Sequence, residues 1–191
     1  MSSFDRSVFI NCPLDESYSI LLQSMLFTII SLGFEPRIAI ESTDAGVNRL
    51  DKIIDLITTS KVSVHDLSRI RSKKSGEYFR LNMPFELGID FGCKKYSQAC
   101  EFSDKKFLIL GSKKYEYMRA LSDISGFDIQ YHHDDTKALI KAIRNWFVNN
   151  LDLKTRLVIT SFGISGQISA FTMLDTSWCA TIHKMKYSMC R

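Results

Sequence analysis

The chain has 191 residues, of which 45% are hydrophobic and 24% charged, and its formal net charge is +4 at pH 7. These proportions are typical of a globular protein and argue against extended disorder. No uninterrupted apolar stretch approaches the roughly 20 residues that cross a bilayer, and the first residues lack the pattern of a secretory signal. We therefore expect a cytoplasmic protein that has no membrane segment.

Five cysteines are scattered along the chain without a C-x-x-C pair. Their odd number and their spacing favour reduced thiols, as in a cytoplasm, over a disulfide framework. The same spacing argues against a zinc site, so no metal is expected.

Short apolar runs alternate with helical patterns along most of the chain. Strands are expected at residues 7–12, 34–40, 61–67, 105–110 and 128–132. Helices are expected from a cap at Asp15 to Gly33 and over residues 49–59, 82–95 and 136–149. Pro36 marks the second strand as an edge or irregular strand. This alternation predicts an α/β fold, a three-layer sandwich with a mainly parallel sheet.

A flavodoxin-like strand order is preferred to a dinucleotide-binding Rossmann order. The first strand is followed by Asn-Cys-Pro-Leu-Asp, where a Rossmann fold would carry G-x-G-x-x-G. Residues 1–150 are interpreted as an α/β nucleotide-binding domain. Residues 151–191, rich in Ser and Thr, are interpreted as a C-terminal extension of unknown role, with an extra strand possible at 157–162.

Polar residues follow several of the predicted strands. In an open parallel sheet, ligands bind beyond the carboxyl ends of the strands, near the point where the strand order reverses. The residues expected at that edge are Asn11, Pro13, Asp15, Arg37, His65, Asp66, Arg69, Arg80, Asn82 and Glu86. Tyr18 and Phe85 are expected in the core rather than against a ligand.

Glu86 is the strongest single candidate. Asn82 is a good N-cap and Pro84 is tolerated in a first helical turn, so Glu86 would lie about one turn into a helix. The positive end of that helix favours an ionised carboxylate and offers N–H groups to a phosphate. A carboxylate there suits the cleavage of an N-glycosidic bond, which passes through an oxocarbenium-like state. The alternative is that Glu86 interacts only with the helix dipole and that Gly88 only permits close packing.

Three separated segments carry a family resemblance. Residues 9–18, 63–69 (Ser-Val-His-Asp-Leu-Ser-Arg) and 80–88 (Arg-Leu-Asn-Met-Pro-Phe-Glu-Leu-Gly) together resemble a group of small bacterial α/β proteins. More distantly, the last segment resembles the Phe-Glu-Leu-Gly step of TIR-like nucleotide-binding domains. It also resembles the Glu-Leu-Gly step of nucleoside 2-deoxyribosyltransferases. Arg-Leu-Asn-Met replaces the transferase Asp-x-Gly-Thr, which argues against transfer between free nucleosides.

The resemblance implies a reaction and roles for residues. The matching Glu of both distant families is implicated in breaking the bond between ribose and base, so Glu86 would be the nucleophile or the oxocarbenium stabiliser. Asp66 would match the transferase acid that contacts substrate. The TIR-like link also implies a role in bacterial antiphage defence, with NAD or a nucleotide as substrate rather than cofactor.

The predicted function is therefore hydrolysis of an N-glycosidic bond in NAD or a nucleotide. Arg37, Arg69 and Arg80 would hold phosphate, and Asn11 and Asp66 would bind ribose. The alternative is a non-catalytic module that senses a nucleotide or binds a protein, such as a second copy or a defence-system partner. Nucleic-acid binding ranks third, because the basic residues are few and no recognised motif accompanies them.

Overall fold

The structure is a computed structural model that describes residues 3–41, 46–70, 81–151 and 153. The chain divides into two units, Met1–Asp152 and Leu153–Arg191. The fold below is that of the first unit. Arg80 and the strand expected at 157–162 lie outside the described residues.

A five-stranded, all-parallel sheet forms the centre of the unit. Its strands are β1 (Ser7–Asn11), β2 (Glu35–Ile38), β3 (Val62–Asp66), β4 (Lys106–Gly111) and β5 (Ile129–Tyr131), in the order β2-β1-β3-β4-β5. Every pairing in this sheet is parallel. The sheet confirms the α/β prediction, and its order is one of the common doubly wound orders.

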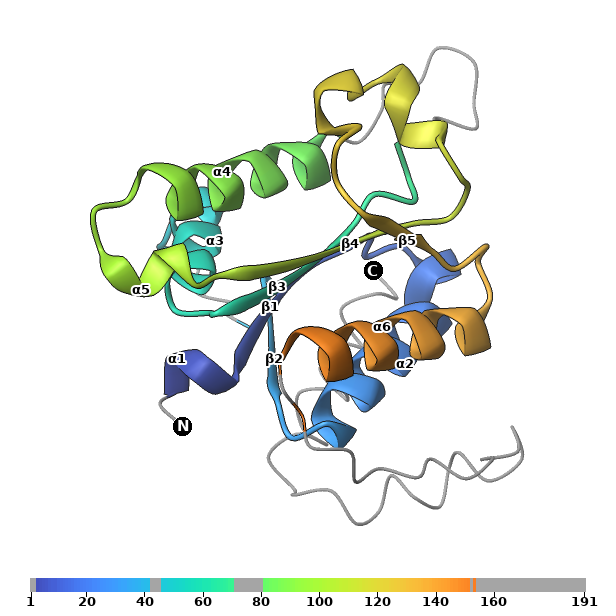
Figure 1. The fold of residues 1–191 in the computed structure, drawn as a ribbon, viewed down its shortest axis with the longest axis horizontal. Helices are drawn as coiled ribbons and strands as arrows, with labels where there is room; N and C mark the ends of the chain where they lie inside the picture. Colours follow the sequence, from blue (N-terminus) through green and yellow to red (C-terminus); the bar gives the residue numbers. More distant parts are fainter. Residues whose placement is uncertain (1–2, 42–45, 71–80, 152, 154–191) are drawn as a thin grey trace. The chain divides into compact units, whose positions relative to one another are not determined.

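Four long helices cover the two faces of the sheet. Figure 1 shows α2 (Ser19–Ser31) beside α6 (Thr136–Asn150) on one face, and α3 (Arg49–Thr58) beside α4 (Asn82–Tyr96) on the other. Shorter helical segments are α1 (Ser3–Arg6), α5 (Cys100–Ser103) and three 3-10 turns at Glu16–Tyr18, Glu116–Arg119 and Ser122–Ile124. The three layers follow from these placements.

The core lies on both faces of the sheet because β1 and β3 are buried along their whole length. On the α3 side, Phe9 packs against Ile53, Leu56 and Ile57. On the α2 side, the rings of Phe34 and Phe147 meet edge-on, 5.1 Å between centroids.

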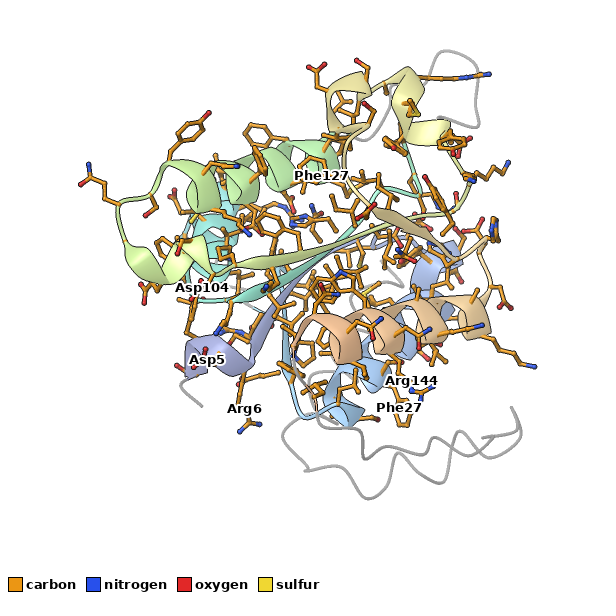
Figure 2. All side chains as sticks on the ribbon, viewed as in Figure 1. Asp5, Arg6, Phe27, Asp104, Phe127 and Arg144 are labelled. Carbon is orange, nitrogen blue, oxygen red and sulfur yellow. The ribbon has the colours of Figure 1, made fainter. Side chains whose placement is uncertain are left out.

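The loop between β4 and β5 closes the α4 side of the sheet. Figure 2 labels Phe127. Its ring packs edge-on against Phe91 of α4, with 5.5 Å between centroids. This contact is one of those that cover the part of α4 that follows Glu86.

Local sequence signals agree with the structure at some positions and not at others. Gly33 adopts a positive φ of 86° just after α2, and Pro36 lies in an edge strand, as expected. Asp15 instead precedes a 3-10 turn and makes no side-chain cap bond there. Asn82 is the first residue of α4 rather than its cap, and Leu81, at the cap position, makes no side-chain bond.

The strand order reverses between β1 and β3. The connection that follows β1 enters α2 on one face, whereas α4, which follows β3, covers the other face. Asn11 and His65 are register partners at the carboxyl ends of these two strands. This rim is where a doubly wound sheet places its ligand.

Candidate functional site

Two consecutive residues of β3 point to opposite layers. His65 faces α4, where its Nε2 lies 3.1 Å from Asp90 Oδ2. Asp66 faces the other side, where it meets Tyr18, which precedes α2. This alternation is the ordinary period of a strand, and it gives the rim two distinct polar clusters.

The first cluster surrounds Asp66, which is fully buried. The Tyr18 hydroxyl donates to its Oδ2, and His132 Nε2 lies 3.0 Å from the same oxygen. Its Oδ1 accepts from the Ser68 hydroxyl and, at 2.8 Å, from the Ser68 backbone N–H. Both carboxylate oxygens are therefore occupied by donors from within the protein.

These donors keep Asp66 ionised. Burial raises the pKa of Asp66, but the hydrogen bonds from His132, Ser68 and Tyr18 outweigh it, so the pKa lies below its ordinary value. The Asp134 backbone N–H donates to His132 Nδ1 at 3.1 Å. Because Nδ1 accepts that bond, we assign the proton of the neutral ring to Nε2, which faces the carboxylate.

The second cluster is a buried polar chain on the α4 side, which we call the Asn11–Lys105 chain. Asn11 Nδ2 lies 3.0 Å from His65 Nδ1, and His65 in turn lies against Asp90. Asp90 Oδ1 is 3.2 Å from the Lys105 ammonium. The chain ends where that ammonium donates to the Ile57 and Ser60 carbonyls, at 2.7 and 2.5 Å.

The Asn11–Lys105 chain ties α4 to the sheet. His65, Asp90 and Lys105 have no exposed surface, so each charge is held by partners inside the protein. Burial raises the pKa of Asp90, but the bond from His65 and the nearby Lys105 charge bring it below its ordinary value. At the rim, Asn11 also donates to the Met83 carbonyl at 2.8 Å, in the first turn of α4.

Glu86 lies on α4 between Met83, which contacts Asn11, and Asp90, which contacts His65. Its side chain is only 7% exposed, and burial raises its pKa to about 7, against an opposing effect of the Arg49 charge. Among the described residues, no hydrogen bond or ion pair occupies its carboxylate. The Glu86 carboxylate is therefore buried at the rim and has no bonding partner among the described residues.

The thiol of Cys12 is affected by several of the predicted site carboxylates. Cys12 follows β1 directly and is buried; burial first, then the charges of Asp66, Glu86 and Asp15, raise the pKa of its thiol well above the ordinary value. Three predicted site carboxylates thus act on one buried atom from different parts of the sequence. The thiol remains protonated near neutral pH, so it is no nucleophile in this state.

Arg69 lies on the outer side of the Asp66 cluster. Its guanidinium is 3.8 Å from Asp15 and 3.6 Å from Asp134, and it lies 5.9 Å above the centre of the Tyr18 ring. The side chain is mostly buried between these groups. Arg69 brings positive charge to the rim, but this charge is already shared between Asp15 and Asp134.

Arg37 lies one strand away from the rim of β1 and β3. Its Nε pairs with Glu41 Oε2 at 2.9 Å. Both residues line a pocket of about 230 Å³ between β2 and α3, together with Ile38, Ala39, Val47, Asp51, Lys52, Asp55 and Leu56. Of the remaining predicted residues, Pro13 is buried after Cys12 and Asn82 is exposed at the start of α4.

Several residues of the site were not predicted. Ser68 and His132 complete the Asp66 cluster, and Asp90 and Lys105 complete the Asn11–Lys105 chain. A charged residue within an apolar pattern, such as Asp90 between Ile89 and Phe91, was a usable signal. His132 carried no local signal, because it reaches Asp66 only through the sheet order.

Comparison with known proteins assigns no function to the site, so the site is interpreted from its geometry. No family model matches the chain, and no curated protein matches it. In the described ranges, no group of three or more His, Cys, Asp or Glu side chains could hold a metal ion. Among the same residues, no helix has the length and apolar character needed to cross a membrane.

Proposed function

We propose that this protein binds NAD or another nucleotide at the rim of β1 and β3 and hydrolyses the N-glycosidic bond. The observation that carries the proposal is Glu86, a buried carboxyl without a hydrogen-bond partner among the described residues, whose charge raises the pKa of the Cys12 thiol and whose own pKa, raised by burial, is partly lowered by the Arg49 charge. It lies where a doubly wound sheet offers its ligand site.

The reaction uses Glu86 as a carboxylate. The bond between C1′ of the ribose and the base nitrogen breaks, and its electron pair leaves with the base. The positive charge that develops on C1′ and the ring oxygen is stabilised, or captured, by the Glu86 carboxylate. Water then adds to C1′ and, where the carboxylate has captured the ribosyl group, displaces it. The proton that the water loses goes to the anionic base of a nucleotide or, with NAD, whose nicotinamide leaves neutral, to solvent.

Burial makes this carboxylate effective. A charge in a water-poor site interacts more strongly with an opposite charge than it does in water. The desolvation that raises the pKa of Glu86 to about 7 is offset when a cationic ribosyl group forms beside it. The ionised form is the reactive one, so we expect the rate to rise with pH through about 7.

The other groups are assigned by their surroundings. Arg49, exposed in the first turn of α3 and close enough to affect the pKa of Glu86, is the cation we assign to the substrate phosphate. Asn11 binds ribose. That Asp66 contacts substrate stays a prediction; its occupied oxygens favour a role in ordering the loop after β3.

The test is direct measurement of the freed base. Purified protein is incubated with NAD and with ribonucleotides, and chromatography follows nicotinamide, adenine and the other bases. Release that grows with protein concentration supports the proposal. If every substrate stays intact while nucleotides still raise the melting temperature, the protein is the alternative, a non-catalytic nucleotide-binding module. A role in antiphage defence, with a partner or a second copy, is proposed on the resemblance alone.

A further inference from the structure

The Asn11–Lys105 chain ends at the rim in an amide whose two polar atoms have different partners. Asn11 is 3% exposed, and its Nδ2 contacts the Met83 carbonyl at 2.8 Å and His65 Nδ1 at 3.0 Å. In the part of the chain that the structure describes, its Oδ1 has no hydrogen-bond partner. This oxygen is not one of the fully buried unpaired atoms, so it reaches accessible surface at the rim and can accept a hydrogen bond from water or from a ligand.

The orientation of this amide follows from its neighbours. A carbonyl oxygen only accepts hydrogen bonds, so the Asn11 atom that contacts Met83 must be the nitrogen. The second N–H of that nitrogen points to His65 Nδ1, which must therefore accept. His65 then carries its proton on Nε2 and donates it to Asp90.

The remaining groups of the Asn11–Lys105 chain hold the Asn11 amide in this orientation. Asp90 is ion-paired with Lys105, whose ammonium is fixed by two backbone carbonyls. A flipped amide would set Asn11 Oδ1 against the Met83 carbonyl and the His65 lone pair. Leaving buried polar groups unpaired in this way is costly, so one orientation is strongly favoured.

We propose that the Asn11–Lys105 chain fixes Asn11 as a pure hydrogen-bond acceptor and thereby selects ligands that carry a ribose hydroxyl. The inference rests on the proposed function, because it assumes that a nucleotide occupies the rim. Met83, which Asn11 contacts, precedes Glu86 by three residues on α4. Asn11, at the end of β1, is therefore attached to the first turn of the helix that carries the reactive carboxyl.

Two variants of His65 separate the parts of this chain. In His65→Asn, the amide oxygen replaces Nδ1 as acceptor for Asn11, but the bond to Asp90 is lost. In His65→Gln, the amide nitrogen replaces Nε2 as donor to Asp90, but Asn11 loses its acceptor. Both disturb the same buried position, so they form a matched pair. Leu139→Ala, a core truncation on α6, is the control for destabilisation alone.

The measurement is equilibrium binding by calorimetry. Each variant is made in a Glu86→Gln background so that the ligand is not consumed. The probes are AMP, its 2′-deoxy form and its 3′-deoxy form. We expect the parent to bind AMP about 10-fold more tightly than at least one deoxy form. We expect His65→Asn and Leu139→Ala to keep that ratio, and His65→Gln to reduce it to about 2-fold or less.

Other results overturn the inference, and each differs from a failure of the proposed function. Equal binding of AMP and both deoxy forms by the parent contradicts the inference even if the wild type releases base. An unchanged ratio in His65→Gln does the same. A clear hydroxyl preference without base release contradicts hydrolysis alone. Absence of any nucleotide binding contradicts both.

Discussion

At the scale of single residues, the two carboxylates at the rim have opposite environments. Asp66 accepts four hydrogen bonds, whereas Glu86 is buried and accepts none from the described residues. The first environment lowers a carboxyl pKa and the second raises it. Carboxyls of one site whose environments drive their pKa values apart are a pattern of sites that perform acid–base or ionic chemistry.

His132 should be important for stability through Asp66. We expect His132→Ala to lower the free energy of unfolding by roughly 2–3 kcal/mol, because a buried carboxylate loses a donor. His132→Gln, which retains an N–H, should recover part of that loss. Denaturant titration measures both, and His133→Asn is the control, since His133 is exposed with a positive φ of 53° that Asn tolerates. Equal stability of His132→Ala and the control would contradict this account.

At the scale of elements, α4 positions the proposed chemistry. Met83, Glu86 and Asp90 lie on its buried face, so one helix carries an attachment to Asn11, the reactive carboxyl and an attachment to His65. The position of Glu86 is therefore set by buried polar contacts on either side of it.

The Asp90–Lys105 ion pair should show the behaviour of a buried pair. We expect Lys105→Met to cost about 3–5 kcal/mol of stability, because it leaves the Asp90 charge without its cation. Asp90→Asn added to that variant should restore part of the loss. Lys106→Met, one residue along and exposed, should change little. A double variant as unstable as the sum of the single variants would show that the two residues act independently.

The α4 sequence was only partly predictive. The existence and length of helix α4 follow from its sequence pattern. Phe85 was expected in the core, but it is 58% exposed, so that prediction was wrong. Gly88 is exposed and an added Cβ would meet nothing within 4 Å, so it does not serve close packing with the sheet. The sequence pattern of one helix does not indicate which of its faces the neighbouring elements cover.

At the scale of the whole molecule, strand alternation was enough to predict the α/β class. The apolar runs at β1 and β3 identify central strands because both faces of such strands are buried. The His132–Asp66 contact joins residues 66 positions apart and depends on sheet order, which local patterns do not encode. The candidate carboxylates could therefore be named from the sequence, and their roles stay a prediction, but the partners that set their ionisation could not be named.

The pH dependence of global stability should report the burial of Glu86. The unfolded chain releases this proton near 4.5 and the folded chain near about 7. Between these values the folded state binds more protons, so the contribution to stability falls as pH rises. We expect Glu86→Gln to be more stable than wild type above about pH 7, by roughly 1–3 kcal/mol, and closest to it below about pH 4.5. A stability difference that does not change with pH would contradict a raised pKa.

The central claim is that the Glu86 carboxylate breaks the bond between ribose and base, and the rate of base release from NAD and ribonucleotides tests it most directly. Wild type and Glu86→Gln are compared at equal folded concentration on both sides of pH 7. The account predicts a wild-type rate that rises with pH through about 7 and a loss of about 100-fold or more in Glu86→Gln. Equal rates in the two proteins would contradict it.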